Sequence, residues 1–217
     1  DREADPVAQE YLRAGYHAFV LRYSVGWENA VWPNPLEDYD QAMELIAAHA
    51  KEWHLIPEKI AVIGFSAGGH LAACAATMAK HRPAAAILAY PVILEGLAAI
   101  CAKGAPGADK AVDSQTCPCF IAATGTDTTV SAMNSLRFVE ALYENGISAE
   151  LHLYAFGPHG FSTARTSIAD PAELCSRTLH WVEDSISWLE DVFGAFTSGL
   201  LALQTEIRWI SFYKMVK

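Results

Sequence analysis

Apolar residues along the chain fall into short, nearly continuous runs, which are typical of strands buried on both faces of a parallel sheet. Four such runs span residues 17–25, 59–63, 84–90 and 120–123. Residues 149–154 instead alternate between polar and apolar side chains, which predicts a half-covered strand. The pattern therefore predicts five strands.

The segments between these strands have the spacing or the alanine content of helices. The predicted helices span residues 5–14, 36–53, 67–80, 134–145 and 170–193. Helices that alternate with buried strands define an α/β fold, and right-handed crossovers place them on both faces of the sheet. We therefore expect an α/β fold with a mostly parallel sheet between two helical layers.

The length of 217 residues suits one domain with a sizeable core. We assign residues 1–193 to this domain, with residues 92–116, which are rich in glycine, as a loop or small lid. Residues 194–217 are apolar and aromatic but have no place in the alternation of strands and helices. They are interpreted as a C-terminal tail without an assigned role.

Composition excludes several classes of partner. The formal net charge of −10 disfavours nucleic acids and anionic membranes, because both attract basic surfaces. No apolar run reaches the ~18 residues of a membrane span, and no signal peptide is visible. The five cysteines have no regular spacing, so we expect free thiols in a reducing cytoplasm, and neither a metal nor a cofactor.

A glycine-rich turn joins the second predicted strand to the alanine-rich helix, with the sequence GFSAGG at 64–69. In the G-x-S-x-G spacing a serine occupies a strained strand-to-helix turn that exposes its hydroxyl, and the glycines leave room for that turn. Ser66 is therefore the predicted nucleophile, and the N–H of Ala67 is the predicted oxyanion donor. In the alternative interpretation Ser66 only caps the helix.

Two further reactive side chains follow strands at the same expected edge of the sheet. Asp127 comes just after the strand at 120–123, and His159 follows the strand at 149–154. Ligands bind at this carboxyl edge in open α/β sheets. We predict that His159 takes the proton of Ser66 and that Asp127 orients the imidazole.

Some of these residues also have structural interpretations. Asp127 fits a turn residue, and Asp109 and Asp113 in the 92–116 loop are weaker candidates for the acid. His70, on the first turn of the predicted helix at 67–80, either lines a pocket or packs in the core. His152 lies within a predicted strand, so we expect a structural role for it.

The motifs EADPVA, AGYH, LRYS, GFSAGGHLAA, NSL and GPHG begin at residues 3, 14, 21, 64, 134 and 157. Together they resemble the acetyl-xylan and feruloyl-esterase-like branch of the α/β-hydrolases, over about residues 1–193. The resemblance implies a serine esterase that acts on small acyl esters, often acetyl groups of plant-wall sugars. It implies Ser66 as nucleophile, Asp127 as acid and His159 as base. Trp27 and Trp32 are candidates to line a sugar or aryl pocket, with packing as the alternative.

The sequence departs from this family in two places. Family members carry a His-Gly-Gly-Gly oxyanion loop after an earlier strand, and nothing here matches it, so this loop and the first strands are expected to be missing. Thr126–Ser131 stands where the family usually has Asp-Asp-x-Val-Val-Pro. A missing strand would leave an unpaired sheet edge that favours a homo-oligomer, unless the tail at 194–217 covers it.

The predicted function is that of a carboxylic-ester hydrolase which acts on a small-molecule ester through an acyl-enzyme. One alternative is a serine peptidase related to the prolyl oligopeptidases, which share the order of the three residues; the chain shows no propeller domain. The other alternative is a non-catalytic hydrolase, which the absent oxyanion loop favours.

Overall fold

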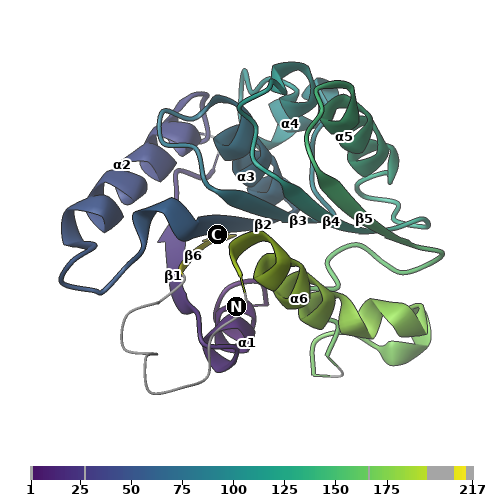
Figure 1. The fold of residues 1–217 in the computed structure, drawn as a ribbon. Coiled ribbons are helices and arrows are strands. Elements are labelled where there is room, and N and C mark those ends of the chain that lie inside the picture. Colours follow the sequence, from purple (N-terminus) through teal and green to yellow (C-terminus); the bar gives the residue numbers. More distant parts are fainter. Residues whose placement is uncertain (1, 27, 166, 195–207, 214–217) are drawn as a thin grey trace.

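The computed structural model describes residues 2–26, 28–165 and 167–194, together with the backbone of a strand at 208–213. Within these residues, six strands form one sheet in the order β1-β6-β2-β3-β4-β5, and all neighbouring strands are parallel (Figure 1). The strands are β1 (His17–Arg22), β2 (Ile60–Phe65), β3 (Ala85–Ala89), β4 (Cys119–Thr124), β5 (Ala149–Tyr154) and β6 (Arg208–Tyr213). The α/β class and the mostly parallel sheet predicted from the sequence are confirmed.

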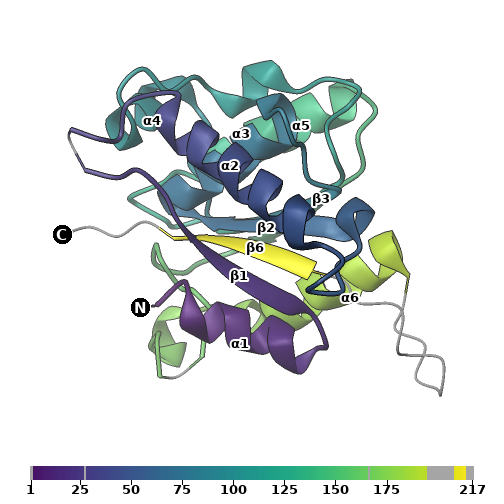
Figure 2. The same cartoon turned by 90° about the vertical axis from the view of Figure 1, so that its left-hand side faces the viewer.

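Helices cover both faces of this sheet, as Figures 1 and 2 show. Two lie on one face, α1 (Asp5–Arg13) and α6 (Trp181–Phe193), and four on the other, α2 (Asn34–His49), α3 (Ser66–Met78), α4 (Glu95–Cys101) and α5 (Met133–Glu144). Every residue of β2, β3 and β4 is buried between the two layers, which explains their continuous apolar runs. The turn from β2 into α3 therefore follows a strand that is buried along its whole length.

The prediction of one helix over residues 170–193 is wrong for its first half, because the α-helix α6 begins only at Trp181. The preceding residues form two short 3₁₀ turns separated by extended backbone at Leu174 and Cys175. Leu174 is buried, and the N–H of Cys175 donates to the carbonyl of Phe156 at 3.3 Å. These contacts with other elements take the place of continuous helical hydrogen bonds.

The segment 92–116, predicted as a loop or small lid, contains α4 and a 3₁₀ turn at Ala108–Ala111. Ala108 is buried in the same core cluster as α3. The N–H of Val92 donates to the carbonyl of Ser66 at 3.0 Å. The segment is therefore a packed wall beside the carboxyl edge of the sheet.

The predicted C-terminal tail contributes an interior strand, which the sequence pattern did not indicate. Strand β6 lies between β1 and β2 and pairs in parallel with both (Figure 2). It thus fills the sheet rather than covering an edge. The rest of the tail after Gly194, residues 195–207 and 214–217, lies outside the described residues.

Deleting residues 195–217 is expected to destabilise the protein and to promote association. Strands β1 and β2 would both lose a partner, and unpaired strand edges bind other chains. We expect the melting temperature to fall by about 10 °C or more, since each kcal/mol moves it by about 2–4 °C in a domain of this size. Circular dichroism and light scattering measure both effects, with deletion of 214–217 as the control. Unchanged melting and solubility would contradict a role for β6 in the sheet.

Candidate active site

Ser66 lies at the turn between β2 and α3, with its backbone at φ +52°, a left-handed conformation that side chains rarely adopt. Gly64 makes this turn sterically accessible. A Cβ at position 64 would lie 2.2 Å from the carbonyl oxygen of Gly68 and 2.7 Å from the Cβ of Ala72. The close approach of α3 to β2 therefore requires glycine at position 64, and Ser66 remains half-buried at the edge of the sheet.

Gly64→Ala is expected to destabilise the fold by about 3 kcal/mol. The added methyl group would clash with the backbone of α3, which cannot move away without displacing the helix. Thermal and urea unfolding measure this change. Gly96→Ala is the matched control, since a Cβ at position 96 meets nothing within 4 Å. That helical position should gain slightly from alanine. Equal stability of the two variants would show that the turn tolerates a side chain.

Asp127 follows β4 and is held by the backbone of its own loop. Its Oδ1 accepts the N–H groups of Thr129 at 2.8 Å and Val130 at 2.9 Å. Its Oδ2 accepts from Nδ1 of His159 at 2.6 Å, and only 1% of the Asp127 side chain is exposed. Because an ionised carboxylate only accepts hydrogen bonds, Nδ1 of the imidazole carries the proton.

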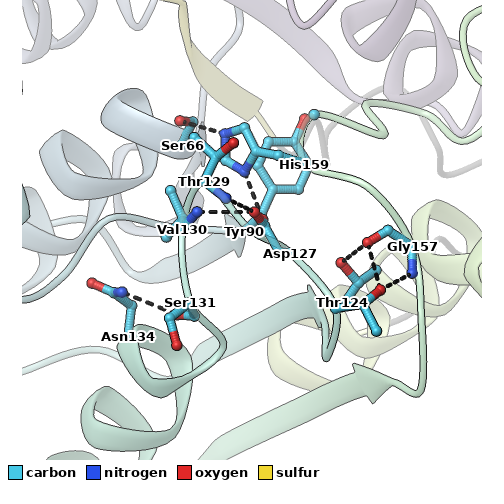
Figure 3. A network of polar contacts seen from close by, with 12 residues as sticks. Ser66, Tyr90, Thr124, Asp127, Thr129, Val130, Ser131, Asn134, Gly157 and His159 are labelled. Atoms are coloured by element: carbon cyan, nitrogen blue, oxygen red, sulfur yellow. Dashed lines mark hydrogen bonds and ion pairs between the residues drawn. The ribbon is translucent and has the colours of Figure 1, made fainter.

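His159 connects this carboxylate to the serine (Figure 3). With the proton on Nδ1, Nε2 of the neutral ring is an acceptor, and it accepts the hydroxyl of Ser66 at 2.9 Å. The structure thus places Ser66, His159 and Asp127 in one chain of hydrogen bonds. The three residues come from loops that follow three different strands, β2, β5 and β4.

The loops that carry Asp127 and His159 are also joined to each other. Thr124 and Thr126 donate their hydroxyls to the carbonyl of Gly157 at 2.9 and 3.2 Å. The N–H of Gly157 donates in return to Oγ1 of Thr126 at 3.0 Å. These bonds fix the acid and the base relative to each other (Figure 3).

A small pocket of about 20 Å³ lies beside Ala67, the predicted oxyanion donor. Its walls come from the end of β1, from the segment before α2, and from α3 and α4, and they include Tyr23, Trp32, Leu71 and Cys101. Trp32 both lines this pocket and packs against two core clusters, so both of its interpretations hold. Trp27, the other predicted aromatic, lies outside the described residues.

His70 both lines this pocket and packs in the core. Its side chain is buried, and Nε2–H donates to the carbonyl of Pro106 at 2.8 Å. Its ring centroid lies 5.9 Å from that of Trp32, edge to face. Burial lowers the pKa of His70, so the ring is held as a neutral part of the wall.

Of the weaker candidates from the sequence, Asp113 and His152 have other partners. Asp113 forms two bonds with the guanidinium of Arg82, at 2.6 and 2.9 Å, and this pair lowers the pKa of Asp113 to about 2. His152 lies in β5 and contacts Glu150 through Nε2 at 2.7 Å. Asp109 lies in the 3₁₀ turn of the 92–116 segment. The imidazole of His159 is paired with Asp127.

The sequence analysis assigned no role to Tyr90, and it used Asn134 only as the start of a predicted helix and of the NSL motif. The ring centroid of Tyr90 lies 4.9 Å from that of His159, with the two planes at 70° (Figure 3). Asn134 accepts the N–H groups of Ile93 and Leu94 at 2.9 and 3.0 Å, which ties α5 to the 92–116 wall. The position of Tyr90, a large aromatic at the carboxyl end of a predicted strand, was the available signal.

The described residues hold no group of three or more His, Cys, Asp or Glu side chains that could bind a metal ion. In the same part of the chain, the helices are too short or too polar to cross a bilayer.

The comparisons with known proteins agree with this fold. The BD-FAE family matches residues 1–93. The solved structure of MGS-M1, an α/β-hydrolase enzyme from a Medee basin deep-sea metagenome library, aligns with a TM-score of 0.78 and 39% identity. The alignment covers 88% of this chain and 78% of that chain. The chain belongs to the α/β-hydrolase family, as an esterase-like member.

Two curated relatives are named for activities on xylan. An acetylxylan esterase from Xylanibacter ruminicola is 30% identical over 176 residues, which cover 71% of this chain and 36% of that protein. Endo-1,4-β-xylanase B from Butyrivibrio fibrisolvens is 30% identical over 194 residues, covering 75% of this chain and 30% of that protein. The chain spans about a third of the length of these two relatives.

Proposed function

We propose that this protein hydrolyses carboxylic esters of small acyl groups, with Ser66 as nucleophile, His159 as general base and Asp127 as the acid that orients it. The observation that carries the proposal is the continuous chain of hydrogen bonds from Ser66 Oγ to His159 Nε2, 2.9 Å, and from His159 Nδ1 to Asp127 Oδ2, 2.6 Å. A serine in this arrangement is activated because its proton has an acceptor.

In the first half of the reaction, Nε2 of His159 takes the proton of Ser66 as Oγ adds to the ester carbonyl. Asp127 stabilises the resulting imidazolium. The N–H of Ala67, at the start of α3, donates to the oxyanion, where the helix dipole also favours negative charge. The imidazolium then gives its proton to the departing alcohol, and Ser66 is left acylated.

Water completes the cycle by the same route. Nε2 of His159 takes a proton from the water as it adds to the acyl carbon, and a second oxyanion forms beside Ala67. The proton returns to Oγ of Ser66 as the ester bond breaks, and the carboxylic acid leaves. The complete cycle consumes one ester and one water and releases one alcohol and one carboxylic acid.

An acetyl ester of a plant-wall carbohydrate is the proposed substrate. The pocket beside Ala67 has a volume of about 20 Å³, which suits a group about the size of one water molecule and so favours a short acyl chain. The match to the BD-FAE family and the acetylxylan esterase among the relatives support the same class. Trp32 offers an aromatic wall for a sugar or aryl group.

Two assays of the purified chain test this proposal. A fluorophosphonate probe reacts only with an activated serine, and we expect it to label Ser66, as peptide mass spectrometry would show. We also expect p-nitrophenyl acetate to be cleaved faster than p-nitrophenyl decanoate, and acetate to be released from acetylated xylan. A folded protein that neither labels nor cleaves any ester would instead be a non-catalytic hydrolase.

A side-by-side assay separates the esterase from the peptidase alternative. Aminoacyl-prolyl amides and acetyl esters are offered at equal concentration, and kcat/KM is measured for both. We expect activity on the esters alone. Higher kcat/KM on the amides would assign the chain to the peptidase class.

A further inference from the structure

Tyr90 has a strained backbone next to the proposed base. It follows β3 with φ +38°, which is unusual for a bulky residue, and its side chain is 1% exposed. Its ring contacts the imidazole of His159 edge to face. A buried residue in a costly conformation beside a reactive group points to a role in holding that group.

The hydroxyl of Tyr90 joins the N-terminal segment to the loop that carries His159. It donates to Oε1 of Glu3 at 2.7 Å and accepts the N–H of Ser162 at 3.0 Å. Glu3 is half-buried, and its carboxylate attracts a positively charged His159. The imidazole is therefore hydrogen-bonded to one carboxylate, Asp127, and the side chain of Tyr90 links it to a second, Glu3.

The neighbouring residue, Arg2, holds the same loop. Nη2 of Arg2 donates to the carbonyl of Gly160 at 3.0 Å and to that of Ile168 at 2.9 Å. Ser162 donates its hydroxyl to the backbone carbonyl of Arg2. Arg2 thus contacts the loop directly at Gly160 and Ser162. Glu3 reaches the imidazole only through the side chain of Tyr90.

Burial raises the pKa of Glu3 above that of an ordinary glutamate. The hydrogen bond from Tyr90 opposes this change most strongly, and the charges of His159 and Arg2 oppose it further. Glu3 therefore becomes neutral at a higher pH than a solvent-exposed glutamate does, and its charge is lost as the pH falls.

We propose that Glu3, held in place by Tyr90, is a second positioning residue for His159 and that its negative charge stabilises the imidazolium formed during acylation. This inference rests on the proposed function of Ser66, His159 and Asp127. Three charged groups are linked to His159 or its loop: Asp127 through Nδ1, Glu3 through the hydroxyl of Tyr90, and Arg2 through the carbonyl of Gly160. The positive charge of Arg2 lowers the pKa of Glu3 and so favours its ionised form.

Glu3→Gln removes the negative charge at position 3 but keeps the hydrogen bond, because the amide oxygen of glutamine can still accept the Tyr90 hydroxyl. We expect the plateau of kcat/KM for p-nitrophenyl acetate to fall by about threefold to tenfold. We also expect the acid-side midpoint of the profile of kcat/KM against pH to move by about half a unit to lower pH. The rate of fluorophosphonate labelling, measured over the same pH range, should show the same displacement.

Glu10→Gln is the matched control. Glu10 is also a partly buried carboxylate of the N-terminal segment, but it pairs with Arg13 and Arg165. Its removal should leave the midpoint where it is. A Glu3→Gln protein whose plateau falls while its midpoint stays fixed would have lost only structural support, and that result would overturn the proposal, as would an unchanged profile.

If Glu3→Gln does not fold, Tyr90→Phe tests the role of Glu3 instead. It keeps the ring against His159 but releases the carboxylate, so the midpoint should move in the same direction by a smaller amount. A fixed midpoint in a folded Tyr90→Phe protein overturns the proposal. Ser66→Ala distinguishes failure of the proposed function from failure of the proposed role of Glu3. Esterase activity in Ser66→Ala would refute the proposed function itself. If Ser66→Ala is inactive but the midpoints of Glu3→Gln and Tyr90→Phe do not move, only the role of Glu3 is refuted.

Discussion

Ser66→Ala is expected to lower kcat for p-nitrophenyl acetate by about 10⁴-fold or more, because the variant has no group that can be acylated. The hydroxyl that donates to Nε2 of His159 is the only one the proposed mechanism uses as nucleophile. Alanine and serine are both strained at φ +52°, so the substitution should change the free energy of unfolding little. Initial rates and thermal unfolding of the same preparation measure the two quantities.

Ser114→Ala serves as the control for this variant. Ser114 is exposed and lies in the 92–116 segment, so its removal should leave both rate and stability unchanged. Fluorophosphonate labelling should disappear in Ser66→Ala and persist in Ser114→Ala. Full esterase activity in Ser66→Ala would remove this serine from the mechanism.

Asp127→Asn is expected to lower kcat by about 10⁴-fold while the loop keeps its shape. The side-chain oxygen of asparagine can still accept the N–H groups of Thr129 and Val130. Its NH₂ group would then face Nδ1 of His159 and donate to it. The imidazole would be driven to carry its proton on Nε2, where it cannot accept the proton of Ser66.

The matched control is Asp113→Asn, which also replaces a hydrogen-bonded aspartate in a loop. Asp113 pairs with Arg82 and not with the imidazole, so its loss should leave kcat close to that of the parent. Thermal unfolding checks that both variants fold. A near-parental kcat in Asp127→Asn together with a large loss in Asp113→Asn would exchange the roles of the two acids.

Local patterns predicted five of the six strands and the turn at Ser66, because burial on both faces and the tight turn restrict which residues can stand there. Buried parallel strands need continuous apolar runs, and the turn at Ser66 needs glycine at position 64. Asp127 and His159 could be predicted to approach Ser66 because loops that follow parallel strands meet at one edge. The hydrogen bonds that join them could not be read from spacing alone.

Features that depend on distant contacts escaped prediction. The α-helix starts later than predicted because Leu174 is buried and the N–H of Cys175 donates to the carbonyl of Phe156. The helical periodicity of residues 170–193 gives no sign of these contacts. Strand β6 pairs with β1 and β2, which are remote in sequence, so its place in the sheet is not a local property. The link from Glu3 through Tyr90 to His159 likewise joins three separate parts of the chain.

The bonds between Thr124, Thr126 and Gly157 have a consequence for how the site fluctuates. Since these bonds link the two loops, we expect the imidazole and its carboxylate to move together. Ser66 is mounted separately, on the turn into α3. We therefore expect the distance from Nε2 to the hydroxyl to vary more than the distance from Nδ1 to Asp127, and a substrate that holds the first pair together would aid the reaction.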